Sequence, residues 1–213
     1  MGNIVWSSGR TNAVGVIVDA AGRPLKTEFL PDRNTFQPHY QQITQQDQVQ
    51  IYEELTQNAD FDFTTSFIHR VHDIKDNRLL PMGWRSSDHF KSMGEVLFEF
   101  MEATDPEVHG DPDYEDQGPS FPGKDKIQYV ATLPSGLNTS GLSVQATLYY
   151  QAIPPYYLKQ RFTTAPNGPA TQRLYYLSSQ LNLDGTPMEH WKLPLVSDKL
   201  VWNGKNWVPG KPL

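Results

Sequence analysis

The sequence predicts an all-β fold, an antiparallel β-sandwich with a few short helices and long ordered loops. Several segments alternate apolar and polar residues with a period of two, which is typical of half-buried strands. The chain also holds 17 prolines and 15 glycines among its 213 residues, and these favour many turns and short elements. Short strands with frequent turns are typical of immunoglobulin-like or jelly-roll-like sandwiches, so we expect one such domain over residues 1–213.

Three segments carry the strand pattern most clearly. Residues 47–55 place Val49, Ile51 and Leu55 on one face. Residues 125–133 and 141–153 alternate in the same way, and turn residues separate them. The pattern therefore predicts an antiparallel hairpin formed by these last two segments.

Two further segments show strand and turn signals. Residues 13–25 are expected to form a strand followed by a turn. The pair Asn203-Gly204, inside "VWNGKNWV", predicts a tight hairpin near the C-terminus.

Helix signals are fewer. Residues 88–103 place Phe90, Met93, Leu97 and Met101 at spacings of three and four, which predicts a short amphipathic helix despite Gly94. Residues 154–162 begin with two prolines, which suit the first turn of a helix. Residues 169–181 bring three leucines to one side and predict a further short helix.

Composition excludes several functional classes. The net charge is −6 and the 18 basic residues are scattered, so we expect no nucleic-acid surface. The chain has no cysteine, which excludes disulfides, thiol catalysis and covalent haem attachment through a Cys-x-x-Cys-His motif. No apolar run reaches the roughly 18 residues of a membrane helix, so we expect no membrane insertion.

Two groups of residues suggest metal binding. His69 and His72 are three apart in a strand-like segment, where their side chains would point to opposite faces, so a shared zinc site is disfavoured. The stretch "HGDPDYEDQG" concentrates hard oxygen ligands, which makes calcium a candidate cofactor. It departs from the EF-hand loop, and a solvated acidic loop is the alternative. The candidate calcium ligands are Asp111, Asp113 and Asp116.

No catalytic motif supports an enzyme. The sequence contains neither a Gly-x-Ser-x-Gly elbow nor a His-Glu-x-x-His pair. Six tyrosines occur as three adjacent pairs, and on strands each pair would place one ring in the core and one on the surface: Tyr149 and Tyr150, Tyr156 and Tyr157, Tyr175 and Tyr176. Packing is one role for these rings, and stacking on a sugar ring is the alternative.

The stretch "IKDNRLLPMGW", residues 74–84, is expected to be an ordered loop held by an arginine and by apolar anchors, Leu79 and Leu80. We expect the Arg78 guanidinium to pair with Asp73, Asp76 or a main-chain carbonyl. We predict that Arg78→Ala lowers the free energy of unfolding by about 1 kcal/mol or more, because its partner is left unpaired; an unchanged melting temperature would contradict this. The predicted structural residues are Asp76, Asn77, Arg78, Pro81, Gly83 and Trp84.

The same stretch also carries a family resemblance. Together with five other phrases, this stretch resembles the C-terminal, haem-free region of multihaem c-type cytochromes. The other phrases are "WSSGRTNAVGVIVD" at 6–19, "FQPHYQQITQQDQVQIYEE" at 36–54, "FTTSF" at 63–67, "ATLYYQAIPPYYLKQRF" at 146–162 and "TQRLYYLSSQLNLDGTPMEHWKL" at 171–193. The resemblance covers most of the chain in the right order. The chain departs from the family in having no haem-binding motif of its own.

The resemblance implies a non-enzymatic accessory or assembly domain that supports electron transfer. It implies that the chain is the C-terminal part of a longer exported bacterial protein, periplasmic or extracellular. Haem c is then expected in an N-terminal region or in a partner cytochrome. Because distal axial ligands of multihaem proteins can come from far along a chain, His39 within "QPHYQ" is a candidate haem ligand, with an ordinary loop histidine as the alternative.

Two other functions remain open from the sequence. One is a secreted carbohydrate-binding module that uses surface aromatic rings, with calcium near Asp111. The other is a hydrolase whose site has no recognisable motif.

Overall fold

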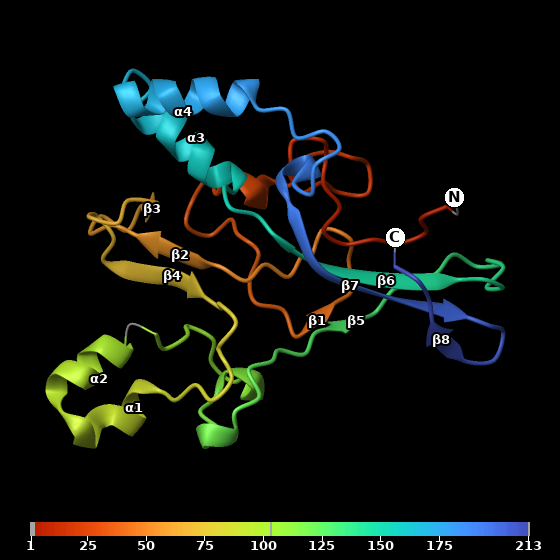
Figure 1. The fold of residues 1–213 in the computed structure, drawn as a ribbon, viewed down its shortest axis with the longest axis horizontal. Helices are drawn as coiled ribbons and strands as arrows, with labels where there is room; N and C mark the ends of the chain where they lie inside the picture. Colours follow the sequence, from red (N-terminus) through yellow and green to blue (C-terminus); the bar gives the residue numbers. More distant parts are fainter. Residues whose placement is uncertain (1–2, 103, 213) are drawn as a thin grey trace. The chain divides into compact units, whose positions relative to one another are not determined.

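The computed structural model, drawn as a ribbon in Figure 1, describes residues 3–102 and 104–212. The chain forms two compact units. Unit 1 contains residues 1–29 and 131–213, and unit 2 contains residues 30–130. Unit 2 is therefore one continuous segment, whereas unit 1 is assembled from both ends of the chain. The single domain expected over 1–213 stays a prediction, and the two units are described one at a time.

Unit 1 combines a sheet with a pair of helices. Its antiparallel sheet has the order β6-β7-β8, from β6 (Ser143–Tyr150), β7 (Leu193–Trp202) and β8 (Trp207–Pro209). The helices are α3 (Pro155–Thr164) and α4 (Pro169–Gln180), each with a proline in its first turn. Two 3₁₀ helices complete the unit, η1 (Lys26–Phe29) and η5 (Glu189–Trp191). Its buried apolar residues include Val16, Ile17 and Val18.

Unit 2 holds the larger core. An antiparallel sheet of order β3-β2-β4 is formed by β2 (Glu54–Gln57), β3 (Phe63–Thr64) and β4 (His72–Asp76). A second, parallel pair joins β1 (Gln42–Ile43) to β5 (Gln128–Tyr129). Its short helices are α1 (Ser87–Phe90), η2 (Lys91–Met93), α2 (Glu95–Glu102), η3 (Pro112–Tyr114) and η4 (Gly118–Ser120). The core includes Ile43, Leu55, Trp84, Tyr114 and Phe121.

The expected all-β sandwich, immunoglobulin-like or jelly-roll-like, is wrong. The described residues form a mixed structure, 23% helical and 19% strand, with three small sheets and no closed sandwich or barrel. The period-two segments contain strands, but most of these strands are short. Of residues 47–55 only Glu54 and Leu55 belong to a strand, β2, which continues to Gln57. Val49 and Ile51 therefore lie in irregular backbone. Alternation did not predict how far the hydrogen-bonded ladder extends, and in β6 it did not predict burial either, since Val144, Leu148 and Tyr150 are exposed.

The hairpin expected from 125–133 and 141–153 is also wrong. β5 pairs with β1 in parallel, while β6 pairs with β7, some fifty residues later in the sequence. The second hairpin is confirmed, since Trp202 pairs with Trp207 across the Asn203-Gly204 turn. Two predicted helices are confirmed as α3 and α4. The third is broken at Gly94, whose φ of 126° lies outside the helical region and separates η2 from α2. None of the described helices is both long enough and apolar enough to cross a membrane.

Candidate functional site

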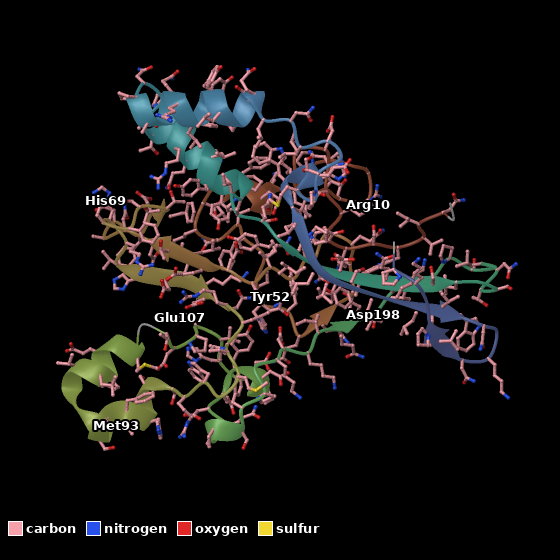
Figure 2. The ribbon with its side chains drawn as sticks, in the orientation of Figure 1. Arg10, Tyr52, His69, Met93, Glu107 and Asp198 are labelled. Atoms are coloured by element: carbon pink, nitrogen blue, oxygen red, sulfur yellow. The ribbon has the colours of Figure 1, made fainter. Side chains whose placement is uncertain are left out.

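The most unusual polar site of unit 2 is a cluster around His39, which we call the histidine–carboxylate cluster. It comprises His39, Tyr52, Asn77, Asp111 and Asp125, with Tyr52 labelled in Figure 2. Separate segments supply these side chains. His39 precedes β1, Tyr52 precedes β2 and Asn77 follows β4. Asp111 is the N-cap of η3, and its carboxylate accepts a hydrogen bond from the Asp113 N–H at 2.9 Å.

Two buried carboxylates face one nitrogen of the imidazole. His39 Nε2 lies 3.0 Å from Asp111 Oδ2 and 4.0 Å from Asp125 Oδ2. The side chains are 11%, 6% and 1% exposed for His39, Asp111 and Asp125. Ligand atoms from the three residues all lie within 4.8 Å of one another, which is close enough for one bound ion to reach all of them.

The other imidazole nitrogen faces only hydrogen-bond donors. Gln50 Nε2 lies 2.8 Å and Asn77 Nδ2 lies 3.1 Å from His39 Nδ1. Both amides are oriented by backbone groups, because Gln50 Oε1 accepts from the Tyr40 N–H and Asn77 Oδ1 accepts from the Glu53 N–H. Two amide donors require an acceptor at Nδ1. These partners therefore fit the tautomer that carries its proton on Nε2, directed at Asp111.

Asp125 has one satisfied and one unsatisfied oxygen. The Tyr52 hydroxyl donates to Asp125 Oδ2 at 2.6 Å, whereas Oδ1 is buried and has no hydrogen-bond partner. Burial raises the pKa of Tyr52, and the hydrogen bond and negative charge of Asp125 raise it further. Burial also raises the pKa of Tyr114, whose ring packs edge-on against His39, with the charge of Asp125 as the next cause. The negative charge of Asp125 is thus felt by both neighbouring phenols.

A second acidic group in unit 2 has a different electrostatic environment. Glu54, Asp73 and Asp76 also bring carboxylate oxygens within 4.8 Å of one another. Two guanidinium groups lie against them. Arg78 donates to both oxygens of Asp76, through Nε to Oδ1 at 2.8 Å and through Nη2 to Oδ2 at 2.5 Å. Arg70 Nη1 lies 3.0 Å from Glu54 Oε1. Two of the three carboxylates, Glu54 and Asp76, therefore have arginine partners within the protein.

The loop at 74–84 contains the structural contacts expected of it. Arg78 pairs with Asp76, one of its three expected partners, and the Asn77 side chain is completely buried. The Gly83 N–H donates to the Phe121 carbonyl at 2.9 Å, and the Trp84 N–H donates to the Pro81 carbonyl at 3.1 Å. The Trp84 ring is buried against Phe121.

One feature of this loop differs from expectation. Leu79 is 45% exposed, so the apolar anchor of the loop is Trp84 rather than Leu79. A bulky aromatic ring buries more apolar area than one leucine and fixes the loop without it.

The three predicted calcium ligands do not converge. Asp111 belongs to the histidine–carboxylate cluster, and no group of potential ligand atoms within the described residues contains Asp113 or Asp116. Asp116 instead accepts from Arg85 Nε at 2.9 Å and from the backbone N–H of Ser86 and Gly118. Burial is the largest single influence and raises the pKa of Asp116, but the hydrogen bonds from Gly118, Arg85 and Ser86 together outweigh it and lower the pKa to about 2. Both carboxylate oxygens of Asp116 thus accept hydrogen bonds that hold the loop around Arg85 in place.

The other sequence-based candidates lie outside the cluster. His69 and His72 appear in no group of potential metal ligands among the described residues, and the His72 ring stacks on Phe61.

The tyrosine pairs do not split between core and surface as expected. Both rings are exposed at Tyr149 and Tyr150, and again at Tyr175 and Tyr176. These pairs are available to a partner surface.

Two residues of the cluster, Tyr52 and Asp125, were not among the sequence-based candidates, and neither was Gln50, which contacts His39. For Gln50 and Tyr52 a signal was present. The period-two pattern that places Val49 and Ile51 on one face places Gln50 and Tyr52 on the other. Asp125, in "GKDKIQY", has no comparable signal, because lysines flank it and nothing local indicates burial.

The contacts of His39 do not fit ligation of a haem iron. Nε2 faces a carboxylate and Nδ1 receives two amide donors, so neither nitrogen offers a free lone pair to a metal outside the cluster. The role of distal haem ligand stays a prediction, and it requires the ring to leave these partners.

A scan against protein-family models, a search of curated proteins and a search of solved structures found no match to this chain.

Proposed function

We propose that this chain is a non-catalytic accessory domain that packs against a haem-bearing domain of a multihaem c-type cytochrome, in the same protein or in a partner, and so supports electron transfer. The sequence resemblance supplies the identity of the partner. The structural observation that carries the proposal is the amount of apolar surface that the chain leaves uncovered.

The accessible surface of the chain is 14385 Å². A compact monomer of this mass exposes about 10,000 Å², and two separate compact domains of half the mass expose about 12,000 Å² in total. The accessible surface of the chain is larger than both of these reference values. An excess of this size is typical of a subunit or domain that buries surface against another one.

Much of the uncovered apolar surface belongs to unit 1. Helices α3 and α4 contain no buried residue. The exposed large side chains of the unit include Tyr149, Tyr150, Tyr175, Tyr176, Leu177, Leu181, Leu195 and Val196. Helices and sheets that bury neither face are marginal in water, and a partner that covers them supplies the missing stabilisation.

Strand β6 offers a second means of attachment. It lies at the edge of its sheet and contains neither a charged residue nor a proline over Ser143–Tyr150. Its only described strand partner is β7. Edge strands of monomeric proteins usually carry charges, prolines or bulges that prevent pairing. The β6–β7 ladder shifts register between Leu148 and Tyr149, so the regular part of the unprotected edge is residues 143–148, which favours addition of a strand from a partner.

The first test is the mass and visible absorption spectrum of the native gene product purified from its source. The proposal expects a longer chain with an intense haem band, or a cytochrome that co-purifies. A colourless protein of this size with no cytochrome partner would overturn it.

A matched pair of variants then tests the surface. Leu177→Lys on α4 should reduce capture of the haem-bearing protein by the tagged chain, while Val96→Lys on α2, which is more exposed, should leave capture unchanged. Both variants should retain the far-ultraviolet circular dichroism of the parent. Equal loss from both variants would show that the effect of charge is not specific to unit 1.

The exposed tyrosine pairs favour a second candidate, a carbohydrate-binding module. Exposed aromatic rings stack on sugar rings, and Tyr175 also lines a groove of about 650 Å³ with Phe162 and Trp191. Binding of the isolated chain to a glycan array, lost on Tyr175→Ala, would favour this function over the first.

A further inference from the structure

The geometry points to a binding site for a hard divalent cation, with Ca²⁺ as the best fit, held by the carboxylates of Asp111 and Asp125. His39 and Tyr52 would be outer partners that hold the two carboxylates in place. This inference does not depend on the proposed function, because it rests only on contacts inside unit 2.

The first argument is uncompensated charge. Asp111 and Asp125 are among the most buried carboxylates of the chain, and no lysine or arginine of the described residues forms an ion pair with either. The group formed by Glu54, Asp73 and Asp76 is a comparison within the same unit, because Arg70 pairs with Glu54 and Arg78 pairs with Asp76. Buried carboxylates are normally paired with a cation or coordinate a metal, and of these two groups only the histidine–carboxylate cluster lacks a lysine or arginine partner among the described residues.

The second argument is the unpartnered oxygen of Asp125. Its side chain is 1% exposed, its Oδ2 accepts from Tyr52, and its Oδ1 has no donor. A buried carboxylate oxygen without a donor is costly, and a bound cation would satisfy it. The Oδ2 atom of the same carboxylate lies 4.0 Å from His39 Nε2, and Asp125 belongs with Asp111 to the set of ligand atoms within 4.8 Å of one another, so an ion bound by this carboxylate can also reach Asp111.

The third argument concerns the class of metal. Zinc and other imidazole-binding metals would need the Nε2 lone pair of His39, with the proton moved to Nδ1. Nδ1 faces the amide groups of Gln50 and Asn77, which are both donors. Nε2 therefore keeps its proton and donates to Asp111. A site built from carboxylate oxygens alone selects a hard cation, and water completes its shell.

A cavity also opens onto the Asp111 side of the cluster. A cavity of about 360 Å³ is lined by His39 and Asp111, together with Gln41, Lys75, Glu107 and His109. Lys75 does not act as the missing counter-charge, because its Nζ is held by the Ile51 carbonyl at 2.8 Å and by Glu53 at 3.1 Å. The polar walls provide space for the water ligands of a bound ion.

The test uses Tb³⁺, a luminescent analogue of Ca²⁺, with the metal-stripped chain. Tyr52 touches Asp125, so excitation of tyrosine should sensitise a bound Tb³⁺ ion, and added Ca²⁺ should compete for it. We expect Asp125→Asn and Asp111→Asn each to weaken binding by roughly tenfold or more, since ligand charge sets the affinity of calcium sites. In the parent chain Ca²⁺ should also raise the melting temperature, because it binds only the folded state.

Three control variants make the assignment specific. Asp73→Asn in the second acidic group and Asp113→Asn beside Asp111 should leave Tb³⁺ binding unchanged. His39→Gln should retain it, because the glutamine amide replaces the Nε2 donor and supplies no imidazole ligand.

Several results would overturn the inference. One is the absence of both a sensitised signal and a Ca²⁺-dependent melting shift in the parent chain. Another is equal binding by Asp111→Asn, Asp125→Asn and the parent. A third is binding of Zn²⁺ in place of Ca²⁺ that is lost with His39→Gln. If Asp125→Asn does not fold, Asp111→Asn and the melting shift of the parent decide the question.

Discussion

Asn77 is the residue through which the loop at 74–84 and the histidine–carboxylate cluster are joined. Its side chain accepts from the Glu53 N–H at 2.9 Å and donates to the Ile51 carbonyl at 2.9 Å and to His39 Nδ1 at 3.1 Å. Its own carbonyl accepts from the Tyr114 hydroxyl at 2.8 Å. One buried amide thus fixes the segment before β2, the imidazole and η3 together.

We predict that Asn77→Ala lowers the free energy of unfolding by about 2–3 kcal/mol, because the Glu53 N–H loses its acceptor in a buried site. Urea denaturation followed by circular dichroism measures this. Asn182→Ala is the matched control, since the exposed Asn182 side chain accepts one local hydrogen bond, from the Asp184 N–H. A loss at Asn77 no larger than that at Asn182 would show that the buried amide is not a structural centre.

Asp73 provides a prediction on pH dependence. Burial raises its pKa, and the negative charges of Glu54 and Asp76 raise it further, while Arg70 lowers it. A carboxyl group whose pKa is raised on folding favours the native state below its unfolded pKa of about 3.9, and that contribution is lost as the pH rises through the folded pKa. Asp73→Asn should therefore stabilise the chain at pH 7 and have no effect below about pH 4.

Melting temperatures of the parent and Asp73→Asn between pH 3 and pH 8 test this. Asp113→Asn, which removes an acidic group outside both clusters, is the control for a general effect of net charge. A stabilisation of Asp73→Asn that is the same at every pH would contradict the electrostatic explanation.

Single residues were predictable from the sequence where their chemistry acts locally. Asp76 and Arg78 are two positions apart, and a guanidinium of known reach near several carboxylates has few choices of partner. The cluster was not predictable in this way. His39 and Asp111 are 72 residues apart, Tyr52 and Asp125 are 73 apart, and no local pattern encodes such a distance. The expectation that Asp111 shares one cation with Asp113 and Asp116 is not met by the geometry, since no group of ligand atoms within the described residues contains Asp113 or Asp116.

Between elements, Gly123 marks a close approach of two loops. Its φ is +61°, and a Cβ added there would lie 2.6 Å from the Met82 backbone nitrogen and 3.0 Å from the Leu80 carbonyl oxygen. The loop at 74–84 is therefore packed directly against the segment that leads to Asp125. The backbone hydrogen bond from Gly83 to Phe121 belongs to the same contact.

We predict that Gly123→Ala destabilises the chain by at least about 2 kcal/mol more than Gly118→Ala, since overpacking adds to backbone strain. Gly118 is a matched control, because its φ is +75° and no atom lies within 4 Å of an added Cβ. Both variants carry the same strain of a positive φ, so their difference isolates the steric contact. Equal free energies of unfolding for the two variants would contradict the close packing.

Helices were more predictable than strands for a physical reason. The hydrogen bonds of α3 and α4 are internal to each segment, so spacing and an initial proline suffice to place them. A strand forms its hydrogen bonds with a second strand, and the alternation of apolar and polar residues does not predict which segment that strand is. Residues 125–133 have the right pattern, yet their only strand pairs with Gln42–Ile43, in a different part of the chain from the segment expected.

For the whole chain, the sandwich prediction failed because it assumed one core shared by all the strands. The buried apolar side chains are instead divided between two units, and the largest completely buried ones, Ile43, Leu55 and Phe121, all belong to unit 2. The amino-acid composition shows that the chain has enough apolar residues to form a core. It does not predict which of them are buried, and Tyr175, Tyr176 and Leu177 are among those that stay on the surface.

This division predicts different behaviour for the two parts of the chain. Unit 2 is a continuous segment with its own core, and both acidic groups lie within it. We expect residues 30–130, expressed alone, to fold cooperatively and to give dispersed amide resonances, as independent domains do. Residues 1–29 joined to 131–213 should associate or lose structure, because their helices and sheet bury little without a partner. Amide spectra and size-exclusion chromatography of both pieces measure this. A disordered 30–130 fragment beside a folded, monomeric remainder would reverse the assignment of the stable core, and with it the reason for placing the docking surface on unit 1.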